Sequence, residues 1–395
     1  MTYENMKDSG IPWIGDVPCN WILSRMSSLY MLRSEKVSDK DYSPLSVTMK
    51  GILPQLDTVA KTEDGDNRKL VKAGDFVINS RSDRRGSCGI SAYDGSVSLI
   101  NIVLIPRNKM NPDYYNWIFH SELFADEFYK WGHGIVDDLW TTRWQEMKQI
   151  IVPVPPLQKQ AEIADYLEKR CAEIDAIISN AKSSIEDYRR WKASMIHQAV
   201  TKGLDPNADM RESGIPWIGK IPAYWNVIKA KYCVTITHGS DPESEGDTPV
   251  YGSGSGSFKT CGEYKEGPAV LIGRKGATLH IPHFIEGRYW NADTAFDVKA
   301  KKGFSLKYFY YSACCFDYKY YISQTTLPGM TQSSYANMKI PVPPAQEQNH
   351  IVDFLDMQCA QIDAVISEKE SFIAELEAYK KSLIYETVTG KRKAE

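Results

Sequence analysis

Residues 9–15 read SGIPWIG, and the same stretch returns at residues 213–219. Each copy is followed by a second tryptophan at the same distance. A second repeated block, VPVPP at 152–156 and IPVPP at 340–344, precedes two long helical patterns. The two blocks recur at different offsets, so the segments between them differ in length, and these segments share little sequence. A constant–variable order that runs through twice predicts one scaffold holding two different recognition domains.

The stretch after each proline pair carries a heptad pattern. Apolar residues recur at alternating spacings of four and three, which is the signature of a coiled-coil seam. Each seam extends roughly 48 Å at about 1.5 Å per residue. Because a globular segment separates the two helices, we expect them to pair antiparallel with each other. The alternatives are that each helix covers its own domain, or that the helices pair between molecules. The predicted seam residues are Leu167, Ile174, Ile178, Ile185 and Met195 in the first helix, and Leu355, Ile362, Ile366, Ile373 and Leu383 in the second.

Two variable segments, residues 22–152 and 226–340, have the same order of predicted elements. In each, β-like runs come first, and an aromatic-rich helical pattern follows at 112–131 or 305–321. A glycine-containing loop then leads to the PVPP block. Strands followed by helices indicate the α+β class, so we expect two members of one α+β domain family.

The composition is that of an ordinary water-soluble protein. The 395 residues suffice for about two or three domains, and 43% are hydrophobic and 25% charged. No apolar run is long enough to span a bilayer and the N-terminus lacks an apolar signal core, so we expect a cytoplasmic protein without membrane contact. The 8 cysteines show no CxxC spacing or disulfide framework. This pattern predicts reduced thiols and no metal site.

The net charge of −3 does not point to a protein that grips phosphates alone. Either nucleic acid is not the partner, or basic residues are concentrated locally and another subunit supplies much of the phosphate contact.

Catalytic motifs are not found in the sequence. It has no GxxxxGK[ST] phosphate loop and no [ND]PP[YF] tetrapeptide of adenine methyltransferases. The run GSGSGS at 252–257 lacks the lysine of a phosphate loop, so we interpret it as a flexible loop or turn. The histidines lack metal-ligand spacing. We therefore expect a chain that is not an enzyme.

Loops suited to nucleic acid occur at corresponding places in both variable segments. Arginine and asparagine can form bidentate contacts with guanine and adenine edges, and hydroxyl groups suit phosphate oxygens. The alternative for the first segment is a charged surface loop whose arginines pair with Asp83 or Asp94. The candidate DNA-binding residues of the first segment are Asn79, Ser80, Arg81, Arg84, Arg85, His133, Thr141 and Arg143. Those of the second are Ser253, Ser255, Arg274, Lys275, Thr278, Gln324, Thr331 and Gln332.

With these motifs, essentially the whole chain resembles the specificity subunit of type I restriction–modification systems. One motif alone would be weak support, whereas the full ordered set occurs twice. The first helix ends Thr201-Lys202-Gly203, whereas the second ends Thr389-Gly390-Lys391, which is the more usual order. This departure concerns only the helix cap. The residues that carry the resemblance are Trp13, Trp217, the proline pairs Pro155-Pro156 and Pro343-Pro344, Gln158, Gln160, Gln346, Gln348 and the tail Val388-Thr389-Gly390-Lys391.

The resemblance implies two target-recognition domains, each reading one half of an asymmetric, split sequence in double-stranded DNA. It implies that the antiparallel coiled coil separates the half-sites as a ruler. Two modification subunits would dock on the repeated blocks and supply S-adenosylmethionine-dependent adenine methylation. Restriction subunits, where present, would add ATP- and Mg-dependent translocation and cleavage. On this resemblance the chain itself binds no cofactor, and the partners supply the missing basic surface.

The predicted domain boundaries are 1–152 for the first motif and recognition domain, 153–204 for the central helix, 205–340 for the repeated motif and second domain, and 341–395 for the last helix.

Other interpretations of the function remain open at this point. The chain could serve a methylation-only or related phage-defence complex, or be a coiled-coil adaptor with protein-binding heads. A fused methyltransferase is disfavoured by the missing catalytic tetrapeptide.

Overall fold

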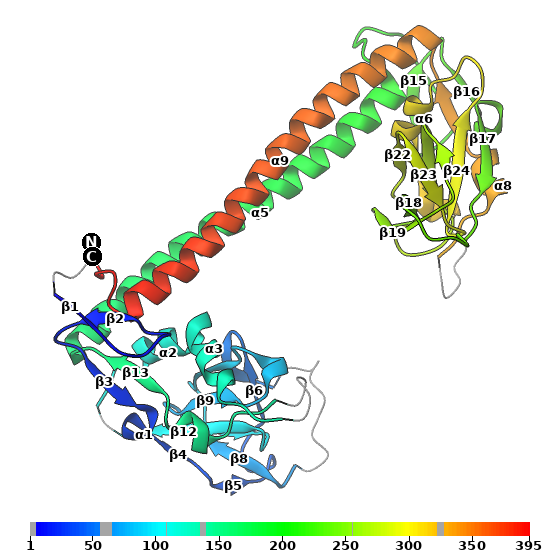
Figure 1. The fold of residues 1–395 in the computed structure, drawn as a ribbon. Coiled ribbons are helices and arrows are strands. Elements are labelled where there is room, and N and C mark those ends of the chain that lie inside the picture. The colour runs from blue at the N-terminus through cyan, green and yellow to red at the C-terminus, as the bar shows by residue number, and fades with distance from the viewer. Residues whose placement is uncertain (1–4, 56–64, 108, 135–139, 255, 322–327) are drawn as a thin grey trace. The chain divides into compact units, whose positions relative to one another are not determined.

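A computed structural model gives the fold (Figure 1). It describes residues 5–55, 65–107, 109–134, 140–254, 256–321 and 328–395. The chain divides into two compact units, and each is treated separately below. Unit 1 comprises Met1–Ala181 with Ser371–Glu395, and unit 2 comprises Lys182–Glu370. Among the parts of the chain that the structure describes, no helix combines the length and apolarity that crossing a bilayer requires.

Unit 1 contains a four-stranded antiparallel sheet in the order β10-β9-β12-β4. Its two faces carry different side chains, because successive residues of a strand point to opposite sides. Phe76 of β9 packs on the Phe119 ring of α2, whereas Val77 and Val103 pack with Leu45 and Ile52 of the β6–β7 hairpin. Aromatic helices therefore cover one face and a small β layer covers the other.

The elements of unit 1 outside the long helices are β1 (Met6–Asp8), β2 (Asp16–Pro18), β3 (Ile22–Arg25), α1 (Met26–Leu29), β4 (Tyr30–Leu32), β5 (Lys36–Val37), β6 (Leu45–Thr48), β7 (Gly51–Pro54), β8 (Arg68–Val71), β9 (Phe76–Asn79), the 3₁₀ turn η1 (Ser82–Arg84), β10 (Cys88–Ile90), β11 (Gly95–Val97), β12 (Asn101–Pro106), α2 (Pro112–His120), α3 (Glu122–Lys130), α4 (Trp144–Met147) and β13 (Ile151–Val154). Smaller sheets pair β1 with β2, β3 with β13, β6 with β7, and β8 with both β5 and β11.

Unit 2 repeats the main sheet with different residues, in the order β22-β21-β24-β17. Strand for strand, β21 and β24 occupy the positions of β9 and β12. A second sheet, β19-β18-β23-β20, lies in the place of the small β layer, and its β18–β23 pair is parallel. The α+β class with two domains of one kind is confirmed.

The elements of unit 2 outside the long helices are β14 (Met210–Glu212), β15 (Lys220–Pro222), β16 (Asn226–Lys229), the 3₁₀ turn η3 (Ala230–Tyr232), β17 (Val234–His238), β18 (Thr248–Tyr251), β19 (Ser257–Cys261), β20 (Lys265–Glu266), β21 (Ala269–Gly273), β22 (His283–Ile285), β23 (Arg288–Asn291), β24 (Ala295–Ala300), α6 (Leu306–Ala313), α7 (Tyr318–Tyr321), α8 (Gln332–Asn337) and β25 (Lys339–Val342).

The aromatic-rich helical stretches are each broken in two, which the sequence pattern did not indicate. Residues 112–131 form α2 and α3, separated at Ser121, whose backbone is extended and whose hydroxyl accepts from the N–H of Phe124 at 3.3 Å. A serine cap of this kind starts a new helix and ends the previous one. In unit 2, α6 ends at Ala313 and α7 begins at Tyr318.

Two long helices, α5 (Leu157–Lys202) and α9 (Ala345–Val388), of 46 and 44 residues, follow the PVPP blocks. Ion pairs show their relative direction. In unit 1 Lys380 lies 2.6 Å from Asp175, and in unit 2 Lys192 lies 2.6 Å from Asp363. Later residues of one helix meet earlier residues of the other, so the helices run antiparallel, as predicted. The two ion pairs occupy equivalent positions of the internal repeat.

The predicted seam is largely buried. Nine of its ten residues are less than 9% exposed, and Leu167, Leu355 and Leu383 are fully buried. The remaining one, Met195, is half-buried beside the buried Ile196. Burial on facing sides of both helices explains why the apolar residues recur every three and four positions.

The ends of the long helices fasten both variable segments in the same way. In unit 1 the Tyr114 hydroxyl of α2 donates to the carbonyl of Val388, 2.9 Å away at the end of α9. In unit 2 the Tyr308 hydroxyl of α6 donates to the carbonyl of Val200, 3.0 Å away near the end of α5. Both tyrosines are fully buried. Each unit therefore contains the start of one long helix and the end of the other.

The second glutamine of each PVPP-x-Q-x-Q block joins a long helix to the preceding domain. The Gln160 Nε2 donates to the carbonyl of Pro155 at 2.9 Å, and its Oε1 accepts from the Asn111 N–H at 3.0 Å. Gln348 makes the same two kinds of hydrogen bond in unit 2. Both side chains are buried, so these amides fix the start of α2 or α6 against the start of α5 or α9.

The SGIPWIG copies form the turns of the β1–β2 and β14–β15 hairpins. The last glycine of each copy has φ +64° or +68°, a conformation that favours glycine. In unit 1 the Ile14 carbonyl accepts from the Tyr385 hydroxyl of α9 at 3.2 Å. In unit 2 the Trp217 carbonyl lies 2.7 Å from Nε2 of His197 on α5. In each unit, the repeated motif therefore binds the last turns of a long helix through a backbone carbonyl.

Candidate nucleic-acid interface

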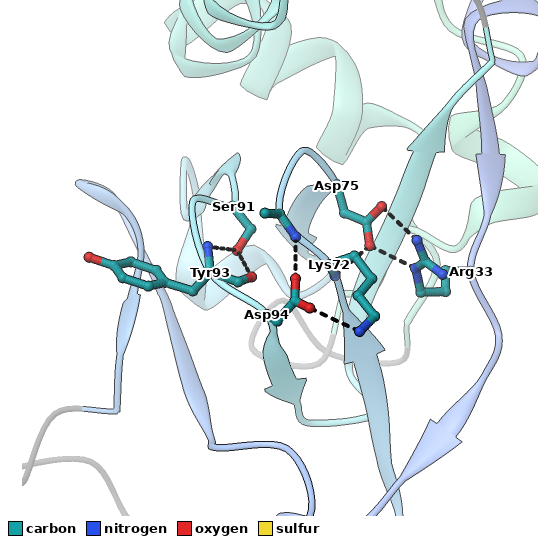
Figure 2. Close-up of polar contacts among 7 residues, drawn as sticks. Arg33, Lys72, Asp75, Ser91, Tyr93 and Asp94 are labelled. Carbon is teal, nitrogen blue, oxygen red and sulfur yellow. Dashed lines mark hydrogen bonds and ion pairs between the residues drawn. The ribbon is translucent and has the colours of Figure 1, made fainter.

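An ion-pair network fixes the start of β9 in unit 1 (Figure 2). The buried Asp75 receives two hydrogen bonds from the Arg33 guanidinium, at 2.7 and 3.0 Å, and this contact raises the pKa of Arg33. Asp94 accepts from the backbone N–H of Ala73 and from the Lys72 ammonium, both at 2.9 Å. These two donors lower the pKa of Asp94. These contacts hold the turn before β9 and its return to the segment around Asp94.

The loop after β9 contains the first group of candidate residues. The Asn79 Oδ1 accepts from the Arg81 N–H at 3.1 Å, which turns the chain into the η1 helix. Ser80 is only 4% exposed, and its hydroxyl donates to the Ile100 carbonyl at 2.5 Å. The sequence predicts a DNA contact at Ser80, whereas the structure buries its hydroxyl in an internal hydrogen bond. Its neighbours remain partly exposed.

The structure joins this loop to the second group of candidates. Arg81 and Thr141 form an antiparallel bridge, and His133 forms one with the same Thr141. The Thr142 N–H donates to the Ser80 carbonyl at 3.0 Å. His133 and Arg143 are exposed beside this junction. Residues more than fifty positions apart in the sequence therefore form one surface.

The arginines of this surface pair with acidic residues and remain accessible. Arg81 and Arg84 lie 3.4 and 3.7 Å from Asp83, and Arg85 pairs with Asp126. Their side chains are 35%, 68% and 50% exposed. Exposed ion pairs contribute only about 0–1 kcal/mol, so a phosphate can replace the carboxylate at little cost. The arginines therefore do pair with Asp83, as the alternative interpretation expected, and they remain exposed. Asp94 pairs with Lys72 and not with these arginines.

A concavity of about 860 Å³ adjoins these arginines. One wall is the loop after β9, and the other is the β6–β7 hairpin with its polar tip Thr48. Burial lowers the pKa of Arg68, whose guanidinium donates to the Ser96 hydroxyl at 2.8 Å and lines the same hollow. The lining residues that the sequence analysis did not identify include Ser46, Thr48, Gln55, Ser98 and Asn101. No local sequence pattern distinguishes them, because the β6–β7 hairpin and the connection from β11 to β12 meet the loop only through tertiary packing.

Unit 2 places its candidates at the same junction. Lys275, two residues after β21, forms a bridge with Gly329, just as Arg81, two residues after β9, does with Thr141. The Met330 N–H donates to the Arg274 carbonyl at 2.9 Å. The loop after the strand and the segment before α8 therefore meet here, as their counterparts before α4 do in unit 1.

Several candidates in unit 2 use their polar groups internally. The Thr278 hydroxyl donates to the Ser253 carbonyl at 2.6 Å, and the Ser253 hydroxyl donates to the Lys275 carbonyl. The Gln332 Nε2 donates to a β17 carbonyl at 2.6 Å. Thr331 caps α8 and is exposed. The candidates Ser255 and Gln324 lie outside the described residues.

The two basic side chains that follow β21 share one acidic partner. Lys275 lies 3.0 Å from Asp293, and Arg274 pairs with the same carboxylate. The hydrogen bond from Lys275, followed by the charge of Arg274, lowers the pKa of Asp293. Arg274 and Lys275 are 28% and 40% exposed, so the pairing resembles that of Arg81 and Arg84 with Asp83.

Comparison with known proteins identifies the class. The family model of the type I restriction modification DNA specificity domain matches residues 33–187 and again residues 227–372. The two matches cover most of both variable segments and most of both long helices. The chain belongs to this family, whose role is DNA sequence specificity.

Two relatives agree with this assignment. The chain is 22% identical, over 98% of its length and 96% of the relative, to a Methanocaldococcus jannaschii protein assigned as the type I restriction enzyme MjaX specificity subunit. It is 31% identical, over 49% of its length and 39% of the relative, to the MjaVIII specificity subunit of the same organism.

Two solved structures share the fold. One, from work on assembly and conformational transition of the type I R-M system, superposes with a TM-score of 0.75 at 14% identity, covering 95% of this chain and 99% of the other. The HsdS subunit from Thermoanaerobacter tengcongensis superposes with a TM-score of 0.54 at 15% identity, covering 95% and 98%.

Proposed function

We propose that this chain is the subunit that directs a type I restriction–modification complex to an asymmetric, bipartite DNA target. The observation that carries the proposal is the pair of equivalent junctions after β9 and β21. Each presents cations on the same scaffold, but with different residues. Two domains with one fold and different loops are suited to read two different half-sites.

The proposal assigns recognition to this chain and chemistry to its partners. Two modification subunits bind the repeated SGIPWIG and PVPP blocks and carry S-adenosylmethionine for adenine methylation. Restriction subunits use ATP and Mg. The repeat supports a pair of equivalent docking sites, because each block recurs in the same structural setting in both units. Partner subunits also explain how a chain with net charge −3 is retained on DNA.

The direct test is adenine-methylation mapping of DNA from cells that co-express this chain with its neighbouring modification subunit. We expect one split motif with a fixed gap. If the complex assembles but no new methylation is found, the chain does not direct modification, and an adaptor function becomes the better explanation.

Independence of the two readers is tested by replacing residues 22–152 with the corresponding domain of a relative. We expect one half-site to change while the other half and the gap are retained. A change in both halves would show that the domains do not read DNA separately.

The coiled coil is proposed to set the gap between half-sites. Removing one facing heptad from α5 and from α9 shortens each helix by about 10 Å. We expect a methylation motif with the same half-sites and a gap shorter by about three base pairs, at 3.4 Å per pair. A gap that stays constant in such a variant would remove the ruler from the proposal.

A further inference from the structure

The concavity of unit 1 contains a buried acceptor without a donor. Asn101, at the start of β12, lies opposite Asn79 of β9 and is 5% exposed. Its Nδ2 donates to the carbonyl and the hydroxyl of Ser98, at 3.2 and 3.1 Å. Its buried Oδ1 accepts no hydrogen bond from the described residues. A buried acceptor left unpaired costs free energy, and a donor of a ligand that reached it would recover that cost.

The surroundings of Asn101 indicate the class of ligand. Asn101 lines the hollow of about 860 Å³, whose rim carries the exposed Arg84 and Arg85. Cavities of roughly 300–1,000 Å³ accommodate organic groups larger than a single ring. Guanidinium groups at the rim suit phosphate oxygens, whereas the neutral amide deeper inside suits a base. The same hollow therefore has positions for both parts of a nucleotide.

The amide of Asn101 can distinguish bases because its two ends are not equally available. Both Nδ2 hydrogens are directed to Ser98, which leaves Oδ1 as an acceptor. The exocyclic amino groups N6 of adenine and N4 of cytosine are the donors that DNA presents in the major groove, whereas guanine and thymine present acceptors there. An acceptor held in this way selects an amino group over a keto group at one position.

We infer that Asn101 is a specificity-determining residue of unit 1. Its Oδ1 accepts a hydrogen bond from the exocyclic amino group of one adenine or cytosine in the half-site, while Arg84 and Arg85 hold adjacent phosphates. This inference rests on the proposed function and adds to it which side chain reads a base and which ones hold the backbone.

The test uses the assembled complex and duplexes carrying its methylation motif. Each adenine of the half-site assigned to unit 1 is replaced in turn by purine, and each cytosine by 2-pyrimidinone, which lack the amino group. We expect the unmodified protein to lose about tenfold in affinity at one position, as for one hydrogen bond whose loss leaves a buried acceptor unpaired. The substitution Asn101→Leu should cause a similar loss on the natural duplex and no further loss on the analogue.

Comparing both proteins on both duplexes separates the loss of the Asn101 hydrogen bond from the effect of weaker base pairing. Losing an amino group also weakens the duplex itself, but that contribution is the same for both proteins and cancels in the comparison. Ser98→Ala serves as the matched control, because it removes one partner of Nδ2 and leaves Oδ1 in place. We expect the Ser98→Ala complex to keep the sensitivity to the analogue.

Three results would overturn the inference. In the first, no amino-group deletion in the half-site weakens binding by the unmodified protein. In the second, the Asn101→Leu complex keeps full affinity for the natural duplex. In the third, the Asn101→Leu complex is as sensitive to the analogue as the unmodified complex. In each case methylation of the split motif by the unmodified complex would leave the proposed function intact. Because the analogue scan needs no variant, the inference stays testable even if Asn101→Leu fails to fold. Absence of any sequence-specific binding by the unmodified complex would instead overturn the proposed function.

Discussion

The contact between the C-terminal tail and unit 1 predicts an unusually severe effect of Gly390→Ala. Gly390 has φ +76°, and a Cβ atom there would lie 2.4 Å from Cδ of Pro18 and 3.0 Å from Cη2 of Trp21. The left-handed conformation costs a non-glycine residue about 1–2 kcal/mol. Overpacking a close contact adds about 1–3 kcal/mol. Together they lower the free energy of unfolding of unit 1 by roughly 2–5 kcal/mol.

Two other glycines provide a graded comparison. Gly10 has φ +67° with no atom within 4 Å of the added Cβ, so Gly10→Ala carries the backbone cost alone. Gly203, the counterpart of Gly390 in unit 2, has φ +72° with its nearest atoms at 3.1 Å, one of them on the flexible side chain of Glu347. We expect the loss of stability to increase from Gly10→Ala through Gly203→Ala to Gly390→Ala.

Calorimetry combined with hydrogen exchange measures these effects separately in the two units. For a unit of this size 1 kcal/mol corresponds to about 2–4 °C, so Gly390→Ala should lower the Tm of unit 1 by roughly 4–20 °C. Faster amide exchange should appear in unit 1 for Gly390→Ala and in unit 2 for Gly203→Ala. If Gly390→Ala were no more damaging than Gly10→Ala, the tail would not pack against Trp21 as described, and the reasoning would be wrong.

Three further predictions concern single contacts. Tyr114→Phe removes the hydrogen bond to the end of α9 and should cost about 1–2 kcal/mol in urea unfolding; an unchanged midpoint would contradict the fastening role. Asp75→Ala leaves the Arg33 guanidinium largely buried and unpaired, and should cost about 3 kcal/mol, against less than about 1 kcal/mol for Lys72→Ala at an exposed pair. Backbone N–H groups lower the pKa of Glu263 to about 2, so its stabilising effect is present above the ordinary value of 4.5 and is lost as the pH falls from there toward about 2. Titration followed by carboxyl-carbon NMR checks this, and a midpoint near 4.5 would refute it.

The long helices were predictable because their signal is local. Heptad spacing depends only on which residues share a helix face, so the seam from Leu167 to Leu383 could be found without coordinates. The equivalent positions of Lys192 and Lys380 followed from the repeat. Their partners, Asp363 and Asp175, could not be assigned in advance, because pairing depends on the antiparallel register.

The candidate DNA-binding surface was predictable only in part. The sequence placed loops rich in arginine, asparagine and hydroxyl residues after strands, and the structure shows these loops after β9 and β21, where the periodicity of a strand ends. The environment of each side chain was not predictable, since the burial of Ser80 and the internal hydrogen bonds of Thr278 and Gln332 depend on distant partners. Asn101 gave no signal in the sequence, because its place beside the concavity follows from the packing of β12 against the β6–β7 hairpin and the loop after β9.

By itself the sequence determined that this protein has two related halves, two long pairing helices and two different α+β domains. Repeats and heptads are linear patterns, and hydrophobic burial enforces them wherever they occur. Only the tertiary structure decided which helix end completes which domain. Tyr114 and Val388 are 274 residues apart, and their hydrogen bond exists because the antiparallel helices return the chain to unit 1. The tertiary structure also decided which polar groups face the concavity, since a buried group must find its partner in space and not along the chain.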